Sequence, residues 1–201
     1  FWLSQLALAL LREPAGTGGG ASQPSWREFL PRLVTILRTD CRFARLTLVR
    51  WLGGFADMAG AFYVLYAVNR LRVPASTVGY FISAGVAGSF LSGVLLGPLG
   101  DRRGCSLVIR VSAALRLLCP VLALLSPLAA PIHPWGPAGV LALVFAAAGM
   151  ANGANMIGFQ NYTLEIAPPA ERATYMGLAN TLGGVLTLAP LVAGWLVGAT
   201  S

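Results

Sequence analysis

The sequence predicts an all-α, polytopic membrane helix bundle, and three observations lead to this fold class. Of the 201 residues, 56% are hydrophobic and only 10% are charged, with a mean hydropathy of +0.71. Water-soluble domains are about 45–50% apolar and about 25% charged, so the composition argues against a soluble enzyme or binding module. Five apolar runs are each about as long as a membrane-crossing helix. No segment shows the alternation of a strand bounded by hairpin turns.

The five runs define the predicted spans. A bilayer core about 30 Å thick requires about 20 mostly apolar helical residues, and hydropathy places the spans at 46–68, 78–100, 105–130, 138–159 and 175–198. Residues 1–11 are apolar but about half the required length. We interpret them as the end of a truncated transmembrane helix, since a signal peptide would need a basic region and a cleavage site.

The connections have the composition of loops. Residues 15–25 are rich in Gly, Ser and Pro and are expected to be flexible, whereas residues 26–45 are basic with interleaved apolar side chains and could form an interfacial helix. The joints 69–77 and 131–137 are short and contain proline.

The distribution of arginine predicts the orientation. The net charge of +7 comes from 14 basic residues, all arginine, against seven acidic ones. Ten arginines fall on one side of the predicted spans, two (Arg70 and Arg72) on the other, and two inside spans. By the positive-inside rule, residues 12–45 are cytoplasmic and Ser201 is extracytoplasmic.

The joint between the second and third spans carries a motif, Gly97-Pro-Leu-Gly-Asp-Arg-Arg-Gly104. It resembles the cytoplasmic loop signature of the major facilitator superfamily, G-x-L-a-D-r-x-G-r-k. Cys105 and Ser106 replace the two basic residues that usually close the signature. Its glycines permit a tight turn, and its carboxylate can accept hydrogen bonds from a helix N-terminus while it pairs with an arginine. We therefore predict a cytoplasmic gate formed by Gly97, Asp101, Arg102 and Gly104. The alternative is a basic cytoplasmic turn that contains a single carboxylate.

A second segment, residues 161–172, is similar to the acidic, proline-bearing joint before the eleventh helix of bacterial members. Together the two resemblances imply that the bundle 46–201 is the C-terminal half of such a protein, with helices seven to eleven of twelve. They also imply that residues 12–45 form the central cytoplasmic loop and that the N-terminal half of the same chain is the missing partner.

The first predicted span contains a carboxylate, Asp57, surrounded at helical spacing by Gly53, Gly54 and Gly60. Placing an acidic side chain in the hydrocarbon core of a membrane costs free energy, and such a residue often marks a substrate or proton pathway. The alternative is a structural pair with an arginine. Arg116 lies near the centre of the third span, and the sequence names no partner for it.

Polar and small residues in the other spans complete the candidates. The resemblance implies that the fourth and fifth spans line a central cavity, so that Asn152, Asn155 and Asn180 are cavity-lining candidates; hydrogen bonding between helices is the competing interpretation. The second span repeats small residues every four positions, which predicts close helix packing. These are Gly85, Ser89, Gly93 and Gly97.

The resemblance implies a secondary transporter of the plasma membrane that moves a small solute by alternating access. Asp57 makes proton coupling the default expectation, efflux is a form found among such members, and a uniporter would look similar. No enzymatic activity, metal, cofactor or nucleic-acid partner is expected, because the chain contains no lysine-bearing phosphate loop and a single histidine. The alternative function is a non-transporting membrane scaffold or sensor that reuses the same bundle.

Overall fold

The computed structural model describes residues 26–131, 133, 135–188, 191 and 194. Contacts divide the chain into two units, residues 1–35 and 36–201, and each is considered by itself. The described part of the first unit is the start of helix α2 (Trp26–Thr39), where the Thr35 hydroxyl donates to the Pro31 carbonyl at 3.0 Å. The predicted tail helix, residues 1–11, lies outside the described residues.

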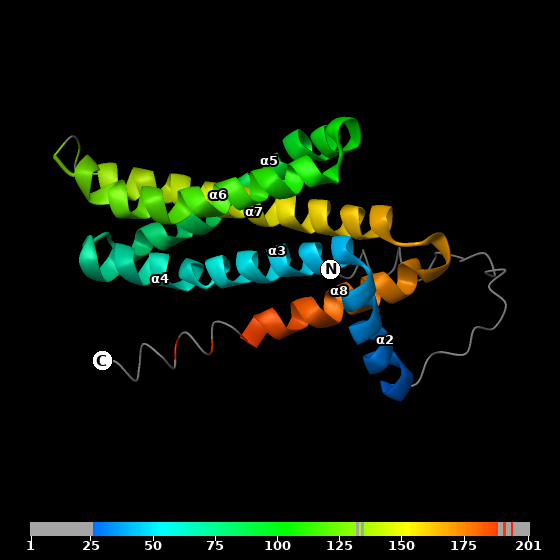
Figure 1. The fold of residues 1–201 in the computed structure, drawn as a ribbon. Helices are drawn as coiled ribbons and strands as arrows, with labels where there is room; N and C mark the ends of the chain where they lie inside the picture. The colour runs from blue at the N-terminus through cyan, green and yellow to red at the C-terminus, as the bar shows by residue number, and fades with distance from the viewer. Residues whose placement is uncertain (1–25, 132, 134, 189–190, 192–193, 195–201) are drawn as a thin grey trace, which may run out of the picture. The chain divides into compact units, whose positions relative to one another are not determined.

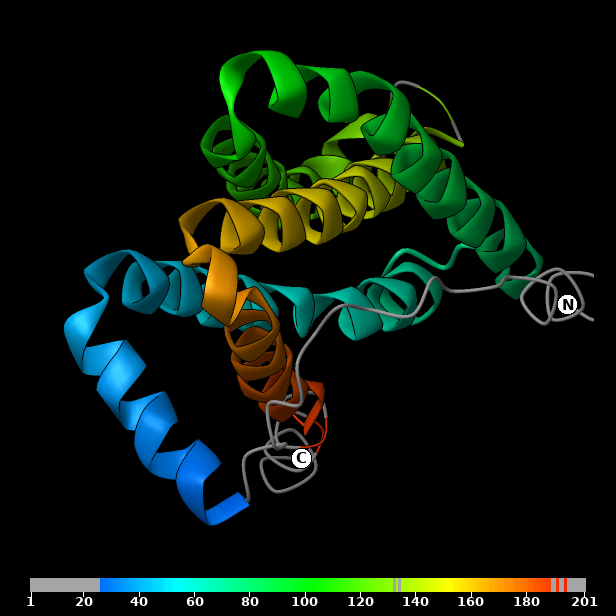
Figure 2. The same cartoon turned by 90° about the vertical axis from the view of Figure 1, so that its right-hand side faces the viewer.

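The described residues of the second unit form helices joined by short turns and contain no strand, which confirms the all-α prediction (Figures 1 and 2). Four of its helical segments are long and apolar enough to cross a membrane. The α-helices are α3 (Cys41–Asp57), α4 (Ala59–Leu65), α5 (Val78–Arg103), α6 (Cys105–Leu125), α7 (Gly136–Ile166) and α8 (Arg172–Val185). Short helical turns join them: η1 (Tyr66–Arg70), η2 (Ala75–Thr77), η3 (Ser126–Ala129), η4 (Pro169–Glu171) and η5 (Leu186–Leu188).

The helix that contains the first predicted span starts earlier than the span. The interfacial helix expected over residues 26–45 ends at Thr39, because the Asp40 carboxylate caps a new helix. Asp40 Oδ1 accepts hydrogen bonds from the backbone N–H groups of Arg42 at 2.9 Å and Phe43 at 3.1 Å. A side-chain acceptor of this kind satisfies donors that the first helical turn leaves unpaired.

The later predicted spans also differ in length from their helices. The second was predicted to end at residue 100, but α5 ends at Arg103; the third was predicted to end at residue 130, but α6 ends at Leu125. The fourth was predicted to end at Phe159, but α7 continues to Ile166 because the first helix-breaking residue comes only at Pro168. The fifth was predicted over 175–198, and α8 covers its first part; beyond η5 the structure describes only Leu191 and Gly194.

Helix α7 lies against both α5 and α6 (Figures 1 and 2). The approach to α5 is very close, since a Cβ atom at Gly149 would collide with the Gly85 carbonyl oxygen, and one at Gly88 with the Ala146 carbonyl oxygen. The Ser89 hydroxyl donates to the Gly149 carbonyl at 2.9 Å. Small residues allow this contact because they let two helix backbones meet.

The contact face of α5 was only partly predicted. Gly85 and Ser89 of the four-residue repeat contact α7. Gly93 and Gly97 do not, since a Cβ atom at either position would have no atom of a neighbouring helix within 4 Å. The contact continues instead through Ser92, whose Oγ would overlap a Cβ at Gly153. An α-helix has 3.6 residues per turn, so residues spaced strictly every four positions do not all stay on the face that contacts a crossing helix.

Helix α8 is joined to α3 by side-chain hydrogen bonds to its backbone. Arg50 Nη1 donates to the Ala179 carbonyl at 3.0 Å, and Trp51 Nε1 donates to the Leu182 carbonyl at 3.2 Å. The Arg50 guanidinium also lies against Gly183, where a Cβ would come within 2.6 Å of its Cζ. These contacts place α8 beside the segment of α3 that leads to Asp57.

Candidate functional site

The candidate site is centred on a tightened turn in the helix of the first predicted span. Helix α3 ends at Asp57 and α4 begins at Ala59, with Met58 as a turn between them. The Met58 N–H donates to the Phe55 carbonyl at 3.2 Å, a tighter i→i−3 bond than the α-helical one. The backbone of Met58 keeps helical dihedral angles, so the chain continues through this turn without a change of direction.

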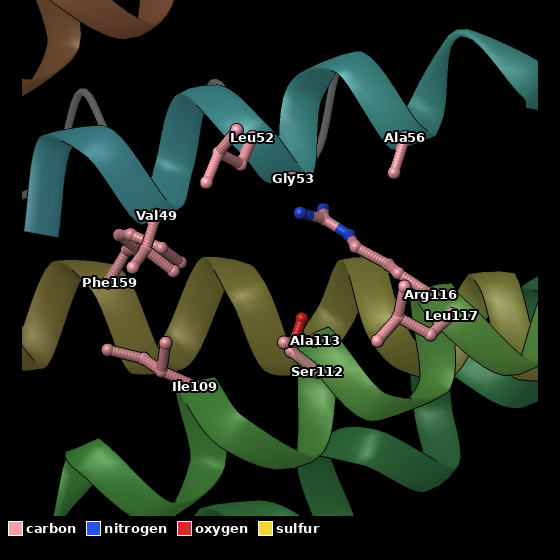
Figure 3. A pocket seen from close by; sticks show the side chains of 10 residues that line it. All are labelled: Val49, Leu52, Gly53, Ala56, Ile109, Ser112, Ala113, Arg116, Leu117 and Phe159. Carbon is pink, nitrogen blue, oxygen red and sulfur yellow. The ribbon is translucent and has the colours of Figure 1, made fainter.

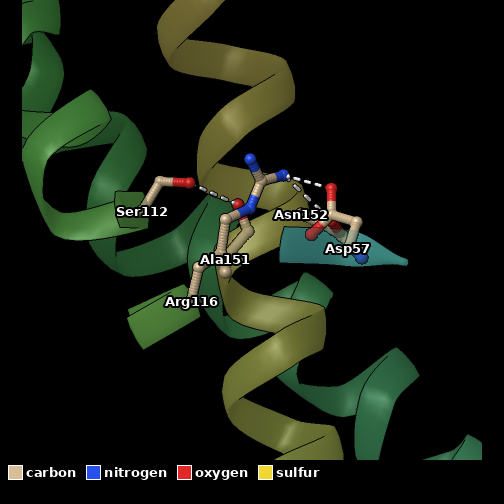
Figure 4. Close-up of polar contacts among 5 residues, drawn as sticks. All are labelled: Asp57, Ser112, Arg116, Ala151 and Asn152. Atoms are coloured by element: carbon tan, nitrogen blue, oxygen red, sulfur yellow. Dashed lines mark hydrogen bonds and ion pairs between the residues drawn. The ribbon is translucent and has the colours of Figure 1, made fainter. Parts of the chain in front are cut away.

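Asp57 forms an ion pair with Arg116, which reaches across from α6 (Figure 4). Arg116 Nη2 lies 2.8 Å from Asp57 Oδ2 and donates a hydrogen bond to Asn152 Oδ1 on α7 at 3.3 Å. The Arg116 side chain is only 7% exposed, whereas that of Asp57 is 43% exposed. Three helices therefore contribute to one polar cluster, and its anion is the accessible member.

A glycine makes room for the cation. The Arg116 guanidinium points toward Gly53 of α3 (Figure 3), and a Cβ at that position would collide with Nη1 and come 3.3 Å from Cζ. Gly53, one of the glycines at helical spacing around Asp57, thus leaves room for the side chain of Arg116. On α6 the neighbouring Ser112 hydroxyl donates to the Ala151 carbonyl at 2.9 Å, which ties α6 to α7 one turn from Arg116.

Asp57 borders two cavities. The smaller, about 70 Å³, also includes Tyr63, Arg116 and Asn152 in its lining. The larger, about 240 Å³, lies on the α8 side and includes Arg50 and Asn155. The Asn155 Oδ1 atom is buried and has no hydrogen-bond partner among the described residues. Asp57 thus forms an ion pair with Arg116 and also lines a cavity that is large enough for several water molecules or a small solute.

Comparison with protein families identifies the chain. The family described as Major Facilitator Superfamily matches residues 2–201. The chain belongs to the major facilitator superfamily. Neither the curated proteins nor the solved structures provide a significant match.

Membership of the major facilitator superfamily makes this chain a multi-pass membrane protein of a transporter family. Its four long apolar helical segments, from α3 to α7, are therefore read as membrane spans. In the described part of the chain, His, Cys, Asp and Glu side chains form no group of three that could hold a metal ion.

The structure of this major facilitator protein brings together some of the predicted site residues. Asp57 and Asn152 both contact Arg116, and Asn155 lines the second cavity beside Asp57. Asn180 is exposed on α8 and lines neither cavity. No partner for Arg116 was predicted from the sequence. Arg116 and Asp57 are opposite charges deep in two predicted spans, and this could have suggested that they pair.

The predicted gate residues lie at the end of α5, where Asp101 and Arg102 are exposed. Gly104 forms the turn into α6 with φ +88° and ψ 150°, a conformation that is essentially restricted to glycine. Within the described residues Asp101 makes no hydrogen bond or ion pair, so no contact that would close a gate is present there.

Proposed function

We propose that this major facilitator protein moves a small solute across the plasma membrane by alternating access, and that proton binding at Asp57 is coupled to that movement. The observation that carries the proposal is the ion pair between an almost fully buried Arg116 and a half-exposed Asp57 at the end of α3. The coarser statement, a transporter of this superfamily, rests on the family match.

The pair can link proton binding to helix movement. Protonation of Asp57 would neutralise the partner of Arg116 and leave Asn152 as the only acceptor in contact with the buried guanidinium among the described residues. A buried charge that loses its partner is strongly unfavourable. Because Arg116 belongs to α6 and Asp57 ends α3, the two protonation states would favour different positions of these helices.

The solute would bind in the 240 Å³ cavity between α3, α7 and α8. Its lining offers the Arg50 cation, the Asp57 anion and the buried Asn155 oxygen, which lacks a partner among the described residues. A buried polar atom without a partner is a group that a ligand can satisfy. The lining fits a small polar solute better than an apolar one.

The remaining features of the proposal follow from the sequence. The arginine distribution favours a cytoplasmic position for residues 12–45 and an extracytoplasmic Ser201. Gly97, Asp101, Arg102 and Gly104 would form the cytoplasmic gate, with Asp101 pairing to the N-terminal half of the same chain in one state. Efflux coupled to proton entry is the direction we propose.

Alternating access predicts that the cavity beside Asp57 opens to each side of the membrane in turn. We would replace Cys41, Cys105 and Cys119 with serine and introduce a reporter thiol by Met58→Cys, which lines that cavity. A membrane-impermeant maleimide should then label the reporter in both right-side-out and inside-out vesicles.

The control is Val144→Cys on α7, whose side chain is completely buried and should stay unlabelled in both preparations. Labelling of the Met58→Cys thiol from one side only would contradict alternating access. That result would support a non-transporting scaffold or sensor built on the same bundle.

A further inference from the structure

A third polar cavity lies toward the other end of α3, away from Asp57. Its volume is about 550 Å³, and α3, α6 and α7 all contribute to it. The proposed transport mechanism uses none of its polar side chains. They are Arg42, Arg45, Ser106, Arg110 and Tyr162.

The charge in this cavity is entirely positive. Arg42, Arg45 and Arg110 are exposed and form no ion pair with any residue that the structure describes. No carboxylate lines the cavity. The carboxylate at the start of α3, Asp40, is already engaged by two backbone N–H groups and by the Tyr175 hydroxyl, which donates to Oδ2 at 3.1 Å. Three guanidinium groups in one cavity favour an anion, and their planar donors suit phosphate oxygens.

A mostly apolar groove continues from this cavity along α3 and α6, and Ser112 and Arg116 are the polar residues of its lining. The cavity shares Val49, Ile109 and Ala113 with a neighbouring space of about 310 Å³ (Figure 3). Leu52 and Leu117 flank that space and are 61% and 71% exposed, so the groove opens to the outside of this unit. In a membrane protein, the acyl chains of lipids can contact an open groove of this kind.

We propose that this site binds an anionic phospholipid. The phosphate-bearing headgroup would contact Arg42, Arg45 and Arg110, and one acyl chain would lie in the apolar groove over Val49, Ile109 and Ala113. A headgroup pocket joined to an apolar groove matches an amphiphile, whereas a free phosphate ion would use only the cationic end. Basic pockets between transmembrane helices are suited to anionic headgroups for the same electrostatic reason.

The test is lipid binding to the purified protein, measured by native mass spectrometry with phosphatidylglycerol and, separately, phosphatidylcholine. The protein should bind phosphatidylglycerol preferentially, and Arg45→Gln/Arg110→Gln should weaken that binding on the order of tenfold or more, since each arginine supplies charge-assisted hydrogen bonds. The matched control, Arg38→Gln/Arg103→Gln, removes two exposed arginines outside the cavity and should bind like the native protein.

A third variant separates a lipid from a free anion. Ala113→Phe places a bulky ring where the cationic cavity meets the groove and should weaken phosphatidylglycerol binding while the arginines remain. Three results would overturn the proposal: unchanged lipid binding in Arg45→Gln/Arg110→Gln, an equal loss in the control double variant, or displacement of the lipid by millimolar inorganic phosphate with no effect of Ala113→Phe. The last result would assign the site to free phosphate.

Discussion

Asp57→Asn is expected to destabilise the protein more than Arg116→Gln does, although both variants break the same ion pair. The difference arises from burial, because Arg116 is 7% exposed and Asp57 is 43% exposed. Asp57→Asn leaves a buried guanidinium without its anion, and breaking a buried pair in this way costs about 3–5 kcal/mol. Arg116→Gln leaves a carboxylate that other side chains enclose only partly and that borders two cavities, so we expect a smaller loss.

Thermal unfolding of the purified variants in one detergent checks this order. The double variant Asp57→Asn/Arg116→Gln should recover most of the stability lost in Asp57→Asn, because it leaves no unpaired charge. Equal unfolding temperatures for Asp57→Asn and the native protein would show that the pair does not form in solution. A larger loss in Arg116→Gln than in Asp57→Asn would show that the burial of the two groups is assigned the wrong way round.

Gly149→Ala is the second substitution with a large expected effect. A Cβ at this position collides with the Gly85 carbonyl oxygen and lies 2.7 Å from its carbon, so α5 and α7 must move apart. Overpacking of this kind costs about 1–3 kcal/mol. The shift would also weaken the hydrogen bond from the Ser89 hydroxyl to the Gly149 carbonyl.

The matched control is Gly93→Ala on α5, where a Cβ has no atoms of neighbouring helices within 4 Å. Alanine favours a helix over glycine by about 1 kcal/mol, so this variant should be at least as stable as the native protein. The unfolding temperature of each variant is the measurement. If both variants behave alike, the close contact between α5 and α7 is not present in the folded protein.

The fold class could be predicted because the composition and length of an apolar run are enough to identify a membrane-spanning helix. Long apolar runs specify helices whatever their neighbours are, since the bilayer requires internal hydrogen bonding. Helix ends are set by single residues, and those were less visible. The start of α3 at Cys41 depends on the Asp40 cap. The tightened turn at Met58 depends on a local hydrogen bond that no residue type in the sequence indicates.

The candidate site was predicted in part. Asp57 and Asn152 are polar residues within apolar runs, and this can be recognised from the sequence alone. Their connection through Arg116 depends on which faces of α3, α6 and α7 meet, and on the space left by Gly53. Asn180 has the same chemical character as the other asparagines, but its exposed position on α8 could not be inferred without the packing of that helix.

The most direct test of the proposed function is solute-driven proton movement in proteoliposomes that enclose a pH-sensitive dye. A panel of small polar solutes is added to the native protein, to Asp57→Asn/Arg116→Gln, and to Glu165→Gln, which removes an exposed carboxylate outside both cavities beside Asp57. The double variant is used because it avoids the stability loss expected for Asp57→Asn alone. At least one solute should move protons through the native protein and the Glu165→Gln control, and the double variant should show no such movement. Normal proton movement in the double variant would contradict a coupling role for Asp57.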